Sequence, residues 1–200
     1  SLNKEVSKAP FKIIPYSKAI ADFGTDKPDL RNPLRILDVS KCFENSGFKI
    51  FEENLSKSHV IKAIVLKNSS KKSRSWFDKM NNWAREQGQK GLGYIIYEDN
   101  QGKGPIANNL KEEKFSKLKE DCDMNNGDVV FFISNVFAEV NSFASKVREK
   151  LCDELNLRKK NSFEFCWIVD YPMYEINNET KKIDFSHNPF SMPQGGMDSL

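Results

Sequence analysis

The stretch Val129-Val130-Phe131-Phe132-Ile133 is the clearest strand signal in the chain, and the fold can be worked out from it in both directions. All five residues are apolar, three are β-branched, and the turn signal Asn126-Gly127 precedes them, which is typical of a buried strand. After it, apolar residues recur at helical spacing from Val136 to Leu155. Asn135 stands where the N-cap of this helix, the longest in the chain, is expected.

Other strands and helices are predicted on both sides of this stretch. The expected strands are Arg35–Val39, Phe48–Phe51, His59–Lys67 and Tyr94–Tyr97, and the expected helices are Tyr16–Phe23, Trp76–Gln87 and Leu110–Cys122. Gly24 is a candidate C-cap for the first helix. Because the elements do not follow a strict βαβ rhythm, the pattern predicts an α+β fold, a mainly antiparallel sheet with helices packed on one face. The charged run Arg158–Ser162 is the clearest boundary.

Composition limits the class of protein. The chain has 200 residues, 38% of them hydrophobic and 30% charged, with a net charge of +3, which suits a soluble globular protein. No apolar run approaches the ~20 residues of a membrane span. The first residues, Ser1–Glu5, form no signal-peptide core and include no initiator methionine, so we expect a chain cut from a longer one.

The four cysteines predict buried free thiols rather than a metal site or disulfides. They are Cys42, Cys122, Cys152 and Cys166, with no C-x-x-C spacing and no histidine at zinc-site distance. Free thiols fit a reducing cytoplasm.

The end of the chain carries the best candidate for a functional side chain. Phe165–Glu175 reads as a buried strand closed by Asp170 and a proline, and the loop Asp184–Pro193 then presents His187, one of two histidines. Pro189 restricts the residue before it, so this loop is expected to be stiff. By sequence alone, however, a single loop histidine is more often structural than functional. For Asp170 we favour a turn-forming role.

Several segments resemble bacterial-type aspartyl-tRNA synthetases. Phe165–Glu175 and Asp184–Pro193 are similar to that family's W-V-V-D-F-P-M-F-E strand and H-H-P-F-T-x-P loop. Tyr16–Arg31 is similar to its Y-x-x-A-x-x-x-Y-G-S-D-K-P-D-L-R segment. Asn45–Phe51 and Lys90–Ile95 resemble segments of the GAD domain that is inserted into these enzymes. The matches run in order from about Phe11 to Gly196.

The resemblance implies a domain organisation and an activity. Residues 35–157 would be the GAD insertion, and residues 1–34 and 158–200 would be flanking pieces of a class II synthetase core. The parent enzyme, a cytoplasmic homodimer, would activate L-aspartate with ATP and Mg²⁺ to aspartyl-adenylate and transfer the aspartyl group to tRNA. The family's ATP-clamping arginine motifs would lie outside this sequence. We therefore expect the chain alone to be inactive and to bind no cofactor, and we assign it no catalytic, cofactor-binding or metal-binding residue.

One residue takes a substrate role from the resemblance. His187 matches the first histidine of H-H-P-F, which contacts L-aspartate in the family. Asn188 replaces the second histidine and cannot titrate, so any role that needs a second imidazole charge is in doubt.

The interpretation stays open for two segments and for the chain as a whole. The segment Asp26–Arg31 is either a tRNA-contacting or site-ordering element or an internal salt-bridge cluster. The basic cluster Lys71–Arg74 is more often merely solvated than bound to an RNA backbone. At the level of the whole chain, the alternative to a synthetase is the tRNA-binding GAD module of a glutamyl-tRNA amidotransferase subunit. A stand-alone α+β interaction domain is the third possibility for the whole chain, after the synthetase and the amidotransferase module.

Overall fold

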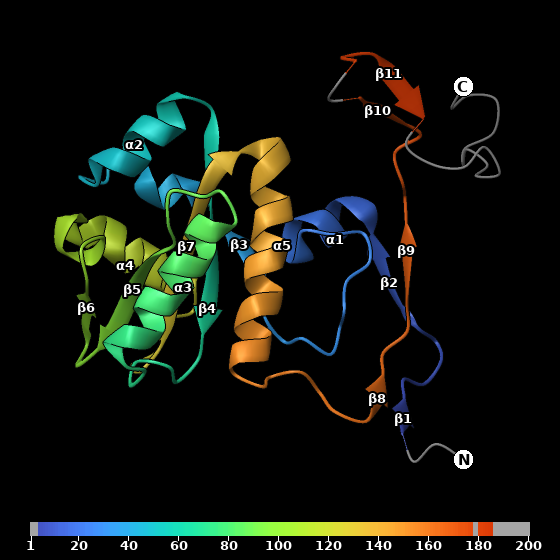
Figure 1. Ribbon diagram of the computed structural model, residues 1–200, viewed down its shortest axis with the longest axis horizontal. Helices are drawn as coiled ribbons and strands as arrows, with labels where there is room; N and C mark the ends of the chain where they lie inside the picture. The colour runs from blue at the N-terminus through green and yellow to red at the C-terminus, as the bar shows by residue number, and fades with distance from the viewer. Residues whose placement is uncertain (1–3, 178–179, 186–200) are drawn as a thin grey trace.

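The computed structural model describes residues 4–177 and 180–185, except for the side chain of Ala138 (Figure 1). Its centre is a five-stranded sheet in which every neighbouring pair is antiparallel. In spatial order the strands are β3 (Ile36–Asp38), β4 (His59–Leu66), β7 (Val129–Val136), β5 (Gly93–Glu98) and β6 (Gln101–Lys103). The α+β class and the antiparallel sheet are therefore confirmed.

Strand β7 is the middle of this sheet, as its apolar run predicts. It pairs with β4 over eight residues, from His59 opposite Val136 to Leu66 opposite Val129. Successive side chains of a strand point to opposite faces. Accordingly, Val129, Phe131 and Ile133 belong to one core cluster, while Val130 and Phe132 belong to another. The sheet is thus buried on both faces.

Helices cover both faces, which corrects the expectation that they pack on one. On one face lie α3 (Arg74–Glu86) and α5 (Phe137–Glu154), whose apolar sides share a core cluster with Phe131. On the other lie α2 (Lys49–Ser56), α4 (Glu112–Asp121) and the 3₁₀ helix η1 (Ser40–Phe43), which pack around Phe132. A second 3₁₀ helix, η2 (Ala107–Asn109), precedes α4.

The strand predicted at Phe48–Phe51 is wrong, because this segment begins helix α2. Phe48, Phe51 and Leu55 recur at helical spacing and pack on the sheet, and the Glu52 carboxylate accepts the backbone N–H of Gly47 at 2.7 Å. Burial of this helical stripe outweighs the short alternating pattern.

The N-cap predicted at Asn135 is also wrong. Pairing with β4 carries β7 on to Val136, and α5 begins at Phe137 without a side-chain cap. The Asn135 side chain instead accepts the backbone N–H of Val136 at 2.8 Å and donates to Glu139 at 2.9 Å.

Helix α1 (Tyr16–Phe23) ends at Gly24 as predicted, and it packs on α5. Gly24 adopts a left-handed conformation with φ of 72°, and a Cβ atom there would lie 2.2 Å from the carbonyl oxygen of Asn141 in α5. Only glycine permits both the conformation and this approach.

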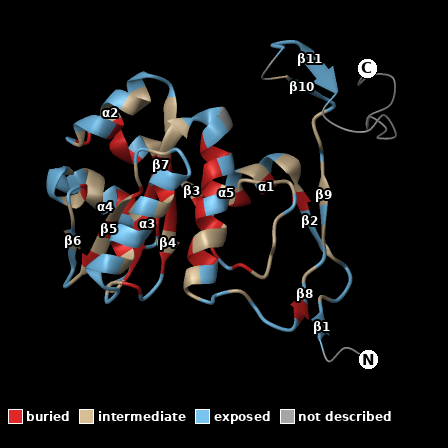
Figure 2. Ribbon diagram, in the orientation of Figure 1, coloured by how far each residue is buried: buried red, intermediate tan, exposed pale blue. Residues whose placement is uncertain are grey.

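Short strands outside residues 35–157 bring the two ends of the chain together in parallel pairs. Strand β1 (Glu5–Val6) pairs with β8 (Ser162–Phe163), and β2 (Lys12–Pro15) pairs with β9 (Cys166–Val169). The hairpin of β10 (Tyr174–Ile176) and β11 (Ile183–Phe185) follows. We call residues 35–157 the sheet unit, and the described residues 4–34, 158–177 and 180–185 the flanking strip. Figure 2 shows the strands of this strip as mostly exposed.

The prediction of free, buried thiols is confirmed for three of the four cysteines. All four are free; Cys42, Cys122 and Cys152 are buried, and Cys166 is half-buried. Within the described ranges, no helix combines the length and the apolar content that crossing a membrane requires.

Candidate functional site

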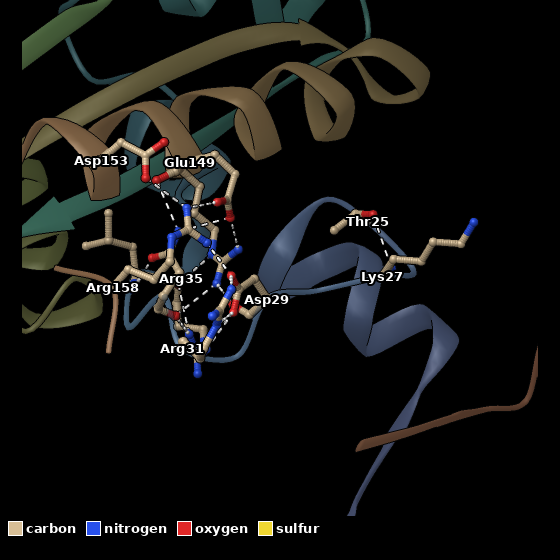
Figure 3. A network of polar contacts seen from close by, with 11 residues as sticks. Thr25, Lys27, Asp29, Arg31, Arg35, Glu149, Asp153 and Arg158 are labelled. Atoms are coloured by element: carbon tan, nitrogen blue, oxygen red, sulfur yellow. Dashed lines mark hydrogen bonds and ion pairs between the residues drawn. The ribbon is translucent and has the colours of Figure 1, made fainter. Parts of the chain in front are cut away.

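The chain passes between the flanking strip and the sheet unit twice. The loop between α1 and β3 leads into the unit, and the segment after α5 leads out of it; we call these two segments the crossings, and they meet at the C-terminal part of α5. A backbone hydrogen bond of 3.1 Å, from Lys159 N–H to Arg31 C=O, joins the crossings directly. Figure 3 shows the polar side chains that gather here.

Asp29 is held by two arginines. Arg31 Nε and Nη2 donate to its two carboxylate oxygens at 2.9 and 2.7 Å, and Arg158 pairs with it from the other crossing. The hydrogen bonds from Arg31 are the main reason why the pKa of Asp29 lies far below its ordinary value of 3.8. Arg158 also pairs with Glu149 at 2.6 Å and with Asp153 at 2.9 Å.

Arg148 of α5 lies close to these charged residues and is completely buried. Its guanidinium donates to three backbone carbonyls of the incoming crossing, those of Asp29, Asn32 and Leu34, at 2.8–2.9 Å. It also pairs with Glu149 at 2.8 Å. Burial lowers the pKa of Arg148, but an arginine stays charged under such conditions.

This cluster, which we call the crossing cluster (Asp29, Arg31, Arg148, Glu149, Asp153 and Arg158), can hold the two crossings in place. The pKa of Asp29 is lowered and that of Arg158 is raised, chiefly by its bonds to Asp153 and Glu149. Neither group exchanges a proton near neutral pH, so neither suits general acid–base catalysis. Of the two alternatives for Asp26–Arg31, the internal salt-bridge cluster describes Asp29 and Arg31.

Lys27 takes no part in the crossing cluster. Its backbone N–H bonds to Thr25 Oγ1 at 3.2 Å, and its side chain is exposed and points away from the cluster (Figure 3). Lys27 therefore does not share the ion pairing of Asp29 and Arg31, which follow it in the sequence.

Sequence analysis missed Arg148 and read Arg158 as part of a linker. A signal for Arg148 exists: it lies four residues after Ala144 and three before Leu151, on the apolar stripe of α5. A charged residue on such a stripe indicates a buried ion with polar partners. No comparable signal marks Arg158, because its partner Asp29 lies 129 positions away.

Asp170 directly follows β9 and adopts a left-handed conformation with φ of 58°. Its side chain is exposed. Asp is one of the few residues that tolerate this conformation in turns, which agrees with the turn-forming role favoured from the sequence. Next to it, the ring of Tyr171 packs against that of Tyr16 in α1, with centroids 5.1 Å apart.

His187 and Asn188 lie outside the described residues, so the role of His187 stays a prediction. The nearest described segment is β11, which ends at Phe185 and pairs with β10.

The basic cluster Lys71–Arg74 is largely engaged. Lys71 pairs with Glu98, and Lys72 lies over the ring of Trp76 at 5.7 Å. Among the described residues, no group of three or more His, Cys, Asp or Glu side chains is placed to hold a metal ion.

Comparison with known proteins gives two findings. A profile of the GAD domain matches residues 51–144. The second finding is similarity to proteins named aspartate–tRNA(Asp/Asn) ligase: 49% identity over 98% of this chain in Gluconobacter oxydans, 50% over 99% in Rickettsia prowazekii, and 48% over 98% in Paramagnetospirillum magneticum. The chain spans 33%, 33% and 22% of the length of these relatives.

Proposed function

We propose that this chain, which contains a GAD domain and belongs over almost its whole length with the aspartate–tRNA(Asp/Asn) ligases, is part of an enzyme that activates L-aspartate and transfers it to tRNA. The first step joins L-aspartate to ATP as aspartyl-adenylate, and the second moves the aspartyl group to the 3′ end of the tRNA. The relatives' names include both aspartate and asparagine tRNAs, so we extend the proposal to both.

The extent of the similarity carries this proposal. Identity of 48–50% runs through 98–99% of the chain and therefore includes the flanking strip as well as the GAD domain. A GAD module of an amidotransferase subunit would account for residues 51–144 and leave the flanks unexplained. We therefore do not favour that alternative.

We further propose that residues 35–157 are the inserted domain and that residues 1–34 and 158–200 belong to the catalytic core. The supporting observation is the uneven exposure of apolar side chains. In β2 and β9, Ile14 is buried against α1, while Ile13 and Trp167 are 64% and 61% exposed on the opposite side. A sheet with one bare apolar face is expected to pack against further protein.

The proposed contact to L-aspartate is His187. It rests on the sequence Ser186-His187-Asn188-Pro189-Phe190, which resembles the family's aspartate-contacting loop. An imidazole can donate a hydrogen bond to a substrate carboxylate. Asn188 can donate as well but cannot carry the charge of a second imidazole.

ATP, Mg²⁺, a homodimeric state and a cytoplasmic location are also part of the proposal for the whole enzyme. The described residues supply no donor set for the metal, and we place no ATP contact on them. What this part of the enzyme contributes is the substrate loop and the crossing cluster, which fixes the inserted domain to the strands that lead to that loop.

Aspartate-dependent exchange of pyrophosphate into ATP, followed by charging of tRNA, tests the proposal in the full-length protein that carries this chain. We expect His187→Ala to lower kcat/KM for L-aspartate by roughly tenfold to a hundredfold, the value of one hydrogen bond to a charged group. KM for ATP should change far less. Asn188→His, the matched control, restores the commoner pair and should have a smaller effect.

Absence of aspartate-dependent exchange in the folded wild-type protein would refute the proposed activity. An unchanged aspartate response in His187→Ala would refute only the role of that histidine. The 200-residue chain by itself should show no exchange.

A further inference from the structure

A gap in the central sheet lies beside the end of β7. The ladder between β5 and β7 ends with Gly93 opposite Phe132, but β7 continues to Val136. The chain before β5 does not follow it, because the backbone N–H of Leu92 is bonded to Asn81 Oδ1 of α3 at 2.9 Å. This bond draws the loop towards α3 and away from the free edge of β7.

The backbone of Ser134 faces this gap. Tyr97 N–H in β5 donates to Asp128 C=O at 2.8 Å, so residue 128 directs its backbone polar groups towards β5. In a strand this direction alternates, and Val130, Phe132 and Ser134 therefore point the same way. Beyond the last pair of the ladder, the N–H and C=O of Ser134 are placed to accept another strand.

A cavity of about 660 Å³ adjoins this gap, because Leu92, Gly93 and Ser134 are among its lining residues. Its lining comes from both layers of helices and from Ser134 and Asn135 near the end of β7. The aromatic lining comes from Phe48, Phe51 and Phe132 in the core cluster on the α2 side, and from Phe77, Tyr94 and Phe143 in the cluster on the α3 side. An extended peptide presents alternate side chains to opposite faces, which matches a cavity lined on both.

Exposed apolar residues occur at this cavity and directly after one of its lining residues in the sequence. Among the described residues, the exposed large apolar side chains of the sheet unit are Ile50, Val136, Phe137 and Leu157. Ile50 lines the cavity, and Val136 and Phe137 directly follow Asn135, another lining residue. An exposed apolar side chain such as Ile50 beside an unpaired strand edge indicates a docking surface.

Charge indicates what the occupant carries. Arg85 and Lys90 line the cavity and are exposed, and neither forms an ion pair with any residue that the structure describes. Asp78 is the one carboxylate of the lining. The excess of positive charge is complementary to an acidic side chain.

We propose that this cavity, the β7 slot, binds a short extended peptide with alternating apolar residues and an acidic residue, which pairs with the backbone of Ser134 as an added strand. Main-chain hydrogen bonds supply the pairing, and the two aromatic walls select the side chains. The occupant is a polypeptide rather than RNA because the slot offers a strand edge between aromatic walls.

The test screens the full-length protein that carries this chain against a phage-displayed library of heptapeptides. Selected peptides, synthesised with a fluorescein label, are then measured by fluorescence anisotropy. We expect alternating apolar residues with an acidic one. Ile50→Glu at the mouth, and Arg85→Glu on the cationic wall, should each weaken binding about tenfold or more, as for a buried anchor of an interface. Leu157→Glu, away from the slot, is the matched control and should change binding less than about twofold.

A change in the peptide tests the strand pairing without altering the protein. N-methylation of the amides in one alternate set should abolish binding, while methylation of the other set should be tolerated, since only one set faces β7. If no selected peptide is weakened by Ile50→Glu, or if both methylated forms bind equally, the proposal is wrong. Stronger binding of single-stranded hexauridylate, with the same sensitivity to Ile50→Glu, would replace the peptide by RNA and overturn it as well.

Discussion

The sheet unit and the flanking strip use apolar side chains in opposite ways. In the unit, both faces of the sheet are covered by helices, and Phe131 and Phe132 are buried on opposite sides of one strand. In the strip, one face of the β2–β9 pair is covered by α1 and the other is bare. Of the fourteen exposed large apolar side chains among the described residues, ten lie in the strip.

This difference separates a part of the chain that completes its own core from a part that does not. A bare apolar face costs free energy unless other protein covers it. The strip therefore has the surface of a segment made to pack against more chain, which agrees with relatives that are about three times as long as the match.

The largest contrast is expected from one aromatic residue in each region. Phe131→Ala should lower the free energy of unfolding of the 200-residue chain by about 3–5 kcal/mol, because it leaves a cavity between β7 and the helices. Trp167→Ala, at an exposed position of the strip, should change it by less than about 0.5 kcal/mol. Urea denaturation monitored by circular dichroism measures both. Equal losses would show that the strip is as well packed as the unit.

The second-largest loss of stability is expected from Arg148, which links the sheet unit to the flanking strip. Arg148→Met removes four hydrogen bonds made by a completely buried guanidinium, so we expect a loss of about 3 kcal/mol in the free energy of unfolding. Arg31→Met, the matched control on the exposed side of the crossing cluster, should cause a much smaller loss. If the two variants unfold at the same urea concentration, Arg148 does not hold the crossings.

A smaller effect is expected from pH. The pKa of Asp29 is lowered in the folded state, so the unfolded chain binds a proton more readily than the folded one. The stabilisation from Asp29 is complete above its ordinary pKa of 3.8 and is lost as the pH falls below that value. Asp29→Asn should therefore be less stable at pH 7 and show a shallower decline on acidification. A parallel acid limb in wild type and variant would refute the ion pairing.

The smallest effect concerns thiol reactivity. Burial raises the pKa of Cys42 and Cys122 to about 12, and both lie in the core of the sheet unit. Cys166 in the strip is half-buried, so iodoacetamide should label it first, although burial raises its pKa too. Mass spectrometry after brief labelling resolves the order, with labelling in urea as the control. Earlier modification of Cys42 would contradict the account.

Sequence predicted most of the sheet unit because its signals are long or fully apolar. Strands β4 and β7 and helices α3 and α5 were found from such runs. The error at Phe48–Phe51 has a simple cause: four residues fit an alternating and a helical pattern equally well. The prediction of helices on one face was wrong although Val129–Ile133 is apolar on both faces, and a strand of that kind requires cover on both.

The pairing of Asp29 with Arg158 could not be predicted from the sequence, for a different reason. Asp29 and Arg158 are adjacent only in the fold, and charged residues in loops carry no periodicity that would pair them. Asp29 and Arg31 lie in the segment for which an internal salt-bridge cluster was one of two alternatives, and Arg148 had a local signal in its place on the apolar stripe of α5. His187 was selected by resemblance alone and stays a prediction.

Hydrogen exchange of the 200-residue chain, followed by mass spectrometry, tests the central contrast most directly. We predict that amides of β4, and of β7 from Val129 to Ile133, exchange only through global unfolding, whereas those of β1, β8, β10 and β11 exchange at least about a hundredfold faster through local opening. Helix α1 should be intermediate, because it packs on α5. Protection of the flanking strip equal to that of β7 would contradict the account, since it would mean that the strip completes its own core.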